Sequence, residues 1–305
     1  MRRWAHRTHL AGWLLALAAG ACRSSAERRS TPDGGGPLSV VDDAGRTVSL
    51  AAPPPARRIV SLAPSITELL FAIGAGDRVV GRTTWCKYPT AATAVPSVGD
   101  GLDPNVEAIA ARRPDLVVLY RSALTESASG RLAALGIPTL VLRHDRLLDV
   151  GRTARLLGRL IGRPAAGDSL ARLIDSTLAV PSRAAIRRPR LAFVVWDNPP
   201  MTIGGGSFLD ELVGLAGGEN VFHDIRSASA TVSLETIAAR DPEWILILTD
   251  SAPMPPAWSA RAEWRVVRAV RAGHFLYLPP ELFGQPSPRT PEAVAKLRRL
   301  LEAAR

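Results

Sequence analysis

Residues 106–119 have the sequence VEAIAARRPDLVVL, and residues 234–247 have the matching sequence LETIAARDPEWILI. Each copy predicts a short helix, a break at an Arg-x-Pro step and then a buried strand, because proline cannot continue a helix and the apolar run after it has the length of a strand. A repeat this far apart indicates a duplicated domain, since solenoid repeats recur roughly every 20–50 residues. We therefore expect two lobes of similar plan, residues 38–145 and residues 187–305.

Short Val/Ile/Leu-rich runs alternate with helix-period segments around both copies, which is typical of α/β units with parallel strands. The expected strands are residues 58–62, 78–82, 116–120, 139–143, 190–196, 244–249 and 275–278, and the expected helices are residues 65–74, 105–113, 126–135 and 209–216. Residues 146–188 carry leucines at helical spacing without a strand pattern. We expect one short and one long helix there, broken at residues 162–164, with Pro181 kinking the second helix or ending it early.

The N-terminus carries an export signal. Three arginines precede an apolar stretch at residues 11–21, which is too short for a spanning helix of about 20 apolar residues, so residues 1–21 are predicted to be a signal peptide. Small residues lead directly into Cys22, and this resembles a bacterial lipobox, so we expect Cys22 to be lipidated. An ordinary secretory signal with an incidental cysteine is the alternative. Residues 22–37 would then be the lipidated cysteine and a flexible tether, holding a periplasmic or extracytoplasmic domain at the membrane.

Composition excludes several classes of protein. A chain of 305 residues that is 47% hydrophobic can bury a core, and two cysteines exclude both a disulfide-stapled scaffold and a four-cysteine zinc site. The net charge of +10 comes from arginines spread along the chain among acidic residues, whereas nucleic-acid binders cluster their basic residues. We expect no nucleic-acid partner, no metal site and a monomer.

Longer motifs carry a family resemblance. They are RIVSLAPSITELLFAIGAGDRVVG at residues 58–81, VPSVGDGLDPNVEAIAARRPDLVV at 95–118, NPPMTIGGGSFLDELVGLAGGENVF at 198–222, VSLETIAARDPEWILI at 232–247 and SPR at 287–289. Over about residues 57–300 the chain resembles the periplasmic binding proteins of the cobalamin, haem and ferric-siderophore class, and is most similar to the cobalamin-binding members. The resemblance implies an α/β fold of two Rossmann-like lobes joined by a long backbone helix, with the ligand held between the lobes.

The resemblance also implies partners. It predicts delivery of the ligand to an ABC transporter permease dimer with its ATPase subunits, and it makes Glu107 and Glu235 docking residues for the two permease subunits. The two glutamates occupy the same position of the two repeats, in the first turn of each expected helix. Alternatively, each glutamate merely complements the positive end of a helix dipole, next to the expected caps Asn105 and Ser233.

A corrinoid ligand is a large flat macrocycle, so aromatic faces should line its cleft. Three aromatic residues lie at or just beyond ends of expected strands, where open α/β sheets place ligands: Trp85, Tyr120 and Trp196. By resemblance, Asn198, Glu281 and Phe283 join them as candidate ligand-binding residues. Each aromatic residue could instead belong to the core. Gly101 and Ser229 stand where the cobalamin-binding members have tryptophans, which weakens the assignment of the ligand.

Other ligands and a different class of protein stay open. Haem would need an axial Tyr or His, and the candidates are Tyr88, Tyr120, His144, His223 and His274. A ferric siderophore would favour clustered arginines, with Arg82, Arg121, Arg143 and Arg226 as candidates.

A membrane-anchored α/β hydrolase would need a nucleophile and a base, and the chain carries none of the usual catalytic motifs. The glycines at residues 204–206 lack the Lys-Ser/Thr of a phosphate loop, and Cys86 fits a buried thiol. We therefore expect a binding protein rather than an enzyme, with no cofactor and with a corrinoid as the transported ligand.

Overall fold

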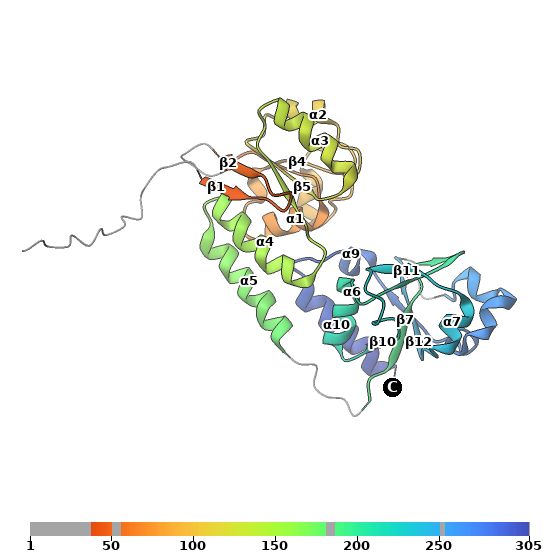
Figure 1. Cartoon of the computed structure of the whole chain (residues 1–305). Coiled ribbons are helices and arrows are strands. Elements are labelled where there is room, and N and C mark those ends of the chain that lie inside the picture. Colours follow the sequence, from red (N-terminus) through yellow and green to blue (C-terminus); the bar gives the residue numbers. More distant parts are fainter. Residues whose placement is uncertain (1–37, 51–55, 181–186, 251–253, 305) are drawn as a thin grey trace, which may run out of the picture. The chain divides into compact units, whose positions relative to one another are not determined.

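The computed structural model describes residues 38–50, 56–180, 187–250 and 254–304, and these belong to one compact unit, residues 36–305 (Figure 1). The predicted signal peptide, the predicted lipidation site Cys22 and the predicted tether lie outside the described residues. Pro181 also lies outside them. Within the described ranges, no helix is both long enough and apolar enough to cross a lipid bilayer.

The first sheet has the strand order β4-β3-β5-β6 and is parallel throughout. Its strands are β3 (Ile59–Ser61), β4 (Val79–Arg82), β5 (Leu116–Tyr120) and β6 (Thr139–Leu142). Alternate residues of β5 pack on opposite faces, which explains its unbroken apolar sequence. Leu116 and Val118 join the core under α1 (Pro64–Ala72), and Val117 and Leu119 join the core under α2 (Val106–Ala111) and α3 (Ala123–Ala134).

The second sheet has the strand order β10-β7-β12-β13 and is also parallel. Its strands are β7 (Arg190–Phe193), β10 (Glu219–Asn220), β12 (Trp244–Leu248) and β13 (Phe275–Leu278). One face packs on α6 (Phe208–Ala216) and α10 (Thr290–Ala303). The other face packs on α7 (Leu234–Ala239), α8 (Arg268–Arg271) and the 3-10 segments Ala257–Ala260 and Ala262–Val266.

The internal repeat is confirmed in detail. Each copy forms a helix followed by the third strand in the order of its sheet, α2 with β5 and α7 with β12. The residue before each proline, Arg113 and Asp241, has a positive φ, of 47° and 44°. Such values are uncommon for residues other than glycine. Two matching turns of this kind support duplication, while the lobe boundaries stay a prediction.

Three antiparallel strand pairings were not predicted. β1 (Leu38–Val41) pairs with β2 (Thr47–Leu50), and β9 (Pro200–Ile203) pairs with both β8 (Trp196–Asp197) and β11 (Ser229–Thr231). The prediction of one strand over residues 190–196 was therefore wrong. β7 ends at Phe193, and Trp196 belongs to a different sheet, because β8 turns back to pair with β9.

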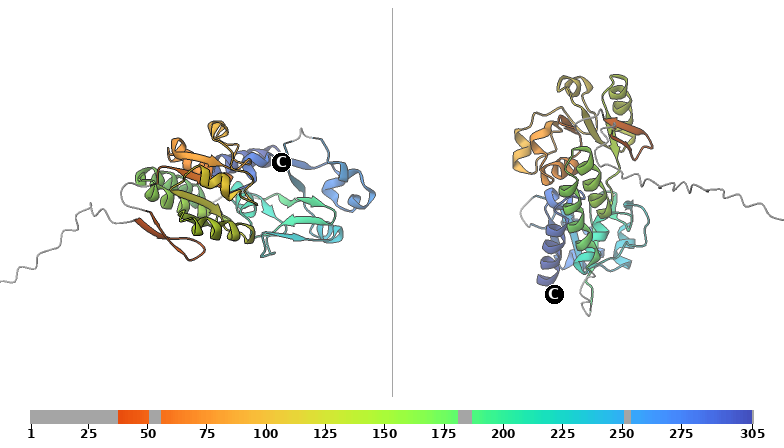
Figure 2. Two further views of the ribbon diagram at one scale, coloured as in Figure 1. Left: turned by 90° about the horizontal axis from the view of Figure 1, so that it is seen from above. Right: turned by 90° about the vertical axis from the view of Figure 1, so that its left-hand side faces the viewer.

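The prediction of one short and one long connecting helix was also wrong. α4 (Leu147–Leu160) has 14 residues and α5 (Pro164–Ala179) has 16, and Figures 1 and 2 show them side by side. The expected break is confirmed, since Pro164 opens α5. The two helices approach closely where both have glycine: a Cβ on Gly167 would lie 2.4 Å from the Ala154 carbonyl oxygen.

Candidate functional site

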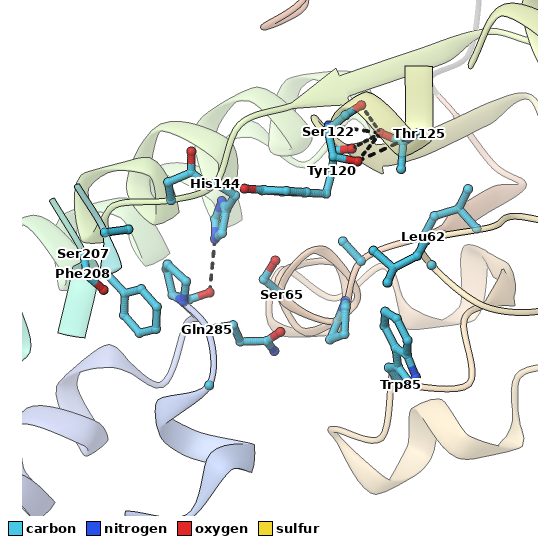
Figure 3. Close-up of a pocket in the computed structure, with 18 of the residues that line it drawn as sticks. Leu62, Ser65, Trp85, Tyr120, Ser122, Thr125, His144, Ser207, Phe208 and Gln285 are labelled. Carbon is cyan, nitrogen blue, oxygen red and sulfur yellow. Dashed lines mark hydrogen bonds between the residues drawn. The ribbon is translucent and has the colours of Figure 1, made fainter. Parts of the chain in front are cut away.

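A pocket of about 530 Å³ lies at the carboxyl ends of β3, β5 and β6 (Figure 3). Its opposite side is formed by loops and the start of α6, which belong to the half of the chain that contains the second sheet. Its volume lies within the roughly 300–1,000 Å³ typical of small-molecule sites. From the first sheet's side the wall is formed by Leu62, Ala63, Pro64, Ser65, Trp85, Gly101, Leu102, Tyr120, Ser122, Thr125, His144 and Asp145. From the other side it is formed by Gly206, Ser207, Phe208, Ala228, Gly284, Gln285 and Pro286.

Three aromatic rings border this space. Trp85 is 44% exposed and Tyr120 is 38% exposed, so both offer part of their rings to solvent at the pocket. Phe208 begins α6 directly after the glycine turn and is half-buried against the core of the second sheet. Figure 3 shows all three around the same cavity. Sequence reasoning found the first two and missed Phe208, although its place beside residues 204–206 was a usable signal.

Tyr120 is held as a neutral phenol. It ends β5, and its hydroxyl donates a hydrogen bond to Asp145 Oδ1 at 2.5 Å. Burial raises the pKa of Tyr120 to about 12, and the hydrogen bond to the negatively charged Asp145 acts in the same direction. The Asp145 carboxylate is in turn positioned by its own backbone N–H, which donates to Asp149 Oδ2 in the first turn of α4 at 3.0 Å.

His144 also lines the pocket, but both its ring nitrogens have partners. Nε2 lies 3.2 Å from the Pro286 carbonyl oxygen, and Nδ1 lies 3.3 Å from Thr153 Oγ1. Since a carbonyl only accepts, the ring donates from Nε2 and accepts at Nδ1. Burial lowers the pKa of His144 to about 4, so the imidazole is neutral at physiological pH.

A buried ion pair fixes the segment that carries Pro286. Arg289 Nε donates to Glu68 Oε2 of α1 at 3.1 Å, and Gln285 Nε2 donates to Glu68 Oε1 at 3.0 Å. Burial raises the pKa of Glu68, although Arg289 acts against this. The Arg289 guanidinium also lies 3.7 Å from the ring centre of Tyr88. Gln285 is thereby held at the pocket wall.

Four predicted ligand residues lie away from this wall. Trp196 and Asn198 lie on the β8–β9 turn, where the Trp196 indole, 61% exposed, donates to the Asn198 carbonyl at 2.8 Å. Glu281 is exposed on α9 (Pro280–Phe283), and Phe283 is fully buried in the core of the second sheet. The structure brings Trp85 and Tyr120 together and leaves these four outside, because β8 departs from β7 and the Phe283 ring packs inward.

Gly101 and the glycines at residues 204–206 are closely packed against neighbouring backbone atoms. A Cβ on Gly101 would lie 3.1 Å from the Leu62 carbonyl oxygen, which is a tight contact, and 3.6 Å from Trp85 Cε3, which is an ordinary one. Residues 204–206 pack against backbone: a Cβ on any of the three would lie 2.4 Å or less from a carbonyl oxygen of residues 223–227. This triplet is therefore a close-packed turn beside the pocket. Ser229, at the start of β11, is exposed outside the wall.

The residues considered for haem or siderophore binding lie largely elsewhere. Of the candidate axial ligands, only Tyr120 and His144 line the pocket. None of the four candidate arginines lies on the described part of its wall, and the Arg82 guanidinium, for example, donates to the carbonyls of Ala92 and Thr93.

The two predicted docking glutamates are equivalent in the structure. Glu107 and Glu235 are both exposed in the first turns of α2 and α7. The expected caps are confirmed: Asn105 Oδ1 accepts from Ala108 N at 2.8 Å, and Ser233 Oγ accepts from Thr236 N at 3.2 Å. Hydrogen bonds from its own backbone N–H and from Ser233 lower the pKa of Glu235. Both readings of the glutamates, docking and helix stabilisation, are compatible with this geometry.

Two parallel sheets covered by helices and linked by α4 and α5 define the helical-backbone type of periplasmic binding protein. The haem-binding protein RhuT from Roseiflexus sp. RS-1 has this fold, with a TM-score of 0.73 and 24% identity, over 82% of this chain and 99% of that one. The vitamin B12-binding protein BtuF of Vibrio cholerae is similar with a TM-score of 0.68 and 26% identity, over 82% of this chain and 98% of that one.

Residues 59–282 match the sequence model of the periplasmic binding protein family, and the chain belongs to that family. A vitamin B12-binding protein from Yersinia pestis is 31% identical over 194 residues, which are 63% of this chain and 69% of that protein. The protein is thus a periplasmic binding protein of the B12, haem and siderophore class. Its family and fold are those of substrate-binding transport proteins.

Proposed function

We propose that this protein captures cobalamin or a related corrinoid in the pocket and delivers it to an ABC import permease. The observation that carries the proposal is the pocket wall, which combines the rings of Trp85, Tyr120 and Phe208 with uncharged hydrogen-bonding groups such as Ser65 and Gln285. Aromatic faces suit a flat macrocycle, and neutral polar groups suit the amide side chains on the rim of a corrin ring. The B12-binding relatives support the same ligand.

Haem is the second candidate, since solved proteins of this fold bind it. The pocket gives haem less support than it gives a corrinoid. The imidazole of His144 is buried and has partners at both nitrogens, and the described wall contains no Lys or Arg to pair with the haem propionates.

Delivery requires a surface that matches a dimeric permease. Glu107 and Glu235, exposed at equivalent places of the repeat, offer two like charges in equivalent settings. Charge complementarity of this kind steers association and fixes register. We extend the proposal to the N-terminus, where residues 1–21 direct export and lipidated Cys22 anchors the protein at the membrane. We also propose that residues 38–145 and 187–305 form two lobes joined by residues 146–188. ATP hydrolysis by the transporter's ATPase subunits drives the import.

Calorimetric titration of the full-length protein, in mild detergent, tests the ligand. Cyanocobalamin, cobinamide and haemin are added in separate experiments. We expect submicromolar dissociation constants for at least one corrinoid and much weaker binding of haemin. Tight binding of haemin without corrinoid binding would contradict the corrinoid assignment and leave the class of protein intact. Failure of all three to bind a folded sample would contradict the proposed function.

A further inference from the structure

We propose that Asp145 determines which tetrapyrroles this pocket accepts: paired with Tyr120, its carboxylate favours uncharged or cationic corrinoids and excludes the anionic haem. This inference rests on the proposed function, because it concerns the ligand of the same site. Asp145 is not among the candidate residues that the sequence indicates, and its proposed role is in ligand specificity.

The charge of the pocket wall disfavours an anionic ligand. Among its described residues only Asp145 carries a formal charge at neutral pH, since the His144 imidazole is buried and neutral. The chain has 38 Lys and Arg, and the described part of the wall has none of them. The guanidinium of neighbouring Arg146 is itself paired with Glu211, 2.5 Å away. A ligand with two carboxylates would therefore enter against a negative charge with no compensating cation on the wall.

The protonation state of Tyr120 also disfavours haem. To bind ferric iron as an axial ligand, the phenol oxygen must lose its proton. Its hydrogen bond to Asp145 Oδ1, at 2.5 Å, holds that proton, and the negative charge of Asp145 opposes formation of a tyrosinate beside it. Arg143 acts in the opposite direction, but more weakly than Asp145. His144, the other candidate axial ligand on the wall, has both ring nitrogens occupied.

A corrinoid needs neither a cation on the wall nor a deprotonated axial ligand from the protein. Its cobalt needs no axial ligand from the protein, and its amide N–H groups can donate to the Asp145 carboxylate. Charge-assisted hydrogen bonds of this kind are stronger than neutral ones. The same carboxylate therefore favours a corrinoid and disfavours haem.

The test is haemin binding to Asp145→Asn, followed by absorption spectroscopy of the full-length protein. Removal of the charge should raise haemin affinity by at least about ten-fold and produce the spectrum of a tyrosinate-ligated ferric haem, the phenol proton passing to solvent. Asp145→Glu, which keeps the charge, should behave like the wild type. Asp77→Asn is the matched control, because Asp77 is an exposed carboxylate just before β4 and does not line the pocket. Its haemin affinity should equal that of the wild type.

The double variant Tyr120→Phe/Asp145→Asn should lose the spectrum of tyrosinate-ligated haem and most of the increase in haemin affinity. Unchanged haemin affinity in Asp145→Asn would overturn the inference, and so would a gain that survives loss of the Tyr120 hydroxyl. If Asp145→Asn melts at a lower temperature than the wild type, Asp145→Ser provides the same readouts. Corrinoid binding by the wild type is measured separately, so failure of the proposed function and failure of this inference are distinguished.

Discussion

Trp85 owes its place at the pocket to the residue that follows it. Cys86 is fully buried, with its sulfur 3.1 Å from Thr67 Oγ1 and 3.2 Å from Thr83 Oγ1, so the loop after β4 is anchored to α1 at this point. Gly101 supports one side of the indole without filling the space in front of it. A buried neighbour and a small packing partner together leave the Trp85 ring half-exposed and fixed in position.

Replacement of Trp85 by alanine should weaken corrinoid binding at least about ten-fold, since loss of one stacking ring is worth about 1.4 kcal/mol or more. Trp196→Ala is the matched control: it removes an indole that is even more exposed but lies outside the wall, and its affinity should equal that of the wild type. Titration calorimetry measures both. Equal affinities for all three proteins would place Trp85 outside the binding site.

The sequence identified aromatic residues of the pocket where they end a strand or follow it within three residues. Trp85 and Tyr120 were found because ligands gather at the carboxyl ends of parallel strands. Asp145 follows β6 by three residues and carried the same signal, but only the structure shows its hydrogen bond to Tyr120. Gln285 was beyond reach, because its place depends on Glu68, more than 200 positions away in the chain. Trp196 was misplaced because nothing in an apolar run marks where one strand stops and another begins.

At the scale of elements, the sequence predicted helices and strands better than their partners. Six of the seven predicted strands and all four predicted helices exist, with ends shifted by at most a few residues, and the predicted strand over residues 190–196 is divided between β7 and β8. The pairing of α4 with α5 was not foreseen, since leucine periodicity shows that a helix has an apolar face but not what covers it. The glycines in these helices carried that information: Gly158 and Gly167 meet where the helices cross, with Cβ positions within about 3 Å of the opposing backbone.

Gly167→Ala should therefore destabilise the protein by about 1–3 kcal/mol, because its Cβ would overlap the Ala154 carbonyl and force the helices apart. Gly130→Ala in α3 is the control, since nothing lies within 4 Å of its Cβ, and alanine there should stabilise the helix by up to about 1 kcal/mol. Urea denaturation gives both free energies of unfolding. A stabilised Gly167→Ala would contradict close packing of α4 on α5.

The first turns of α2 and α7 test the docking proposal. Glu107→Arg with Glu235→Arg should abolish transport in uptake assays and leave corrinoid affinity unchanged, because both residues lie outside the pocket. Glu126→Arg with Glu292→Arg is the control, since these are also exposed glutamates in the first turns of helices, α3 and α10. Loss of a favourable helix-dipole interaction should affect both pairs alike. Normal uptake in the first pair would leave only the helix-stabilising role.

At the scale of the whole described unit, the segment from Gly284 to Arg289 connects the two sheets' regions. It meets the end of β6 through His144 and meets α1 through Glu68. Each contact buries a titratable group, Glu68 or His144, and the two groups change the stability of the folded protein in opposite directions as the pH falls. Folding raises the pKa of Glu68, so Glu68 favours the native state as the pH falls. Folding lowers the pKa of His144, so His144 disfavours the native state as the pH falls. Stability of this connection therefore depends on pH through both groups, and their contributions can be separated by mutation.

His144 has a pKa of about 4 in the folded protein against 6.5 for a histidine in water, so between these values the unfolded chain binds more protons. Its contribution to stability is complete above pH 6.5 and is lost as the pH falls towards 4. Between pH 7.5 and 5 this loss amounts to about 2 kcal/mol. His144→Gln, which cannot titrate, should lack that part of the pH dependence, while Glu68 and the other carboxylates contribute equally to both proteins and cancel in the difference. Urea denaturation of the two proteins at both pH values measures it, and parallel pH profiles would show that the imidazole is not buried in its neutral form between β6 and Pro286.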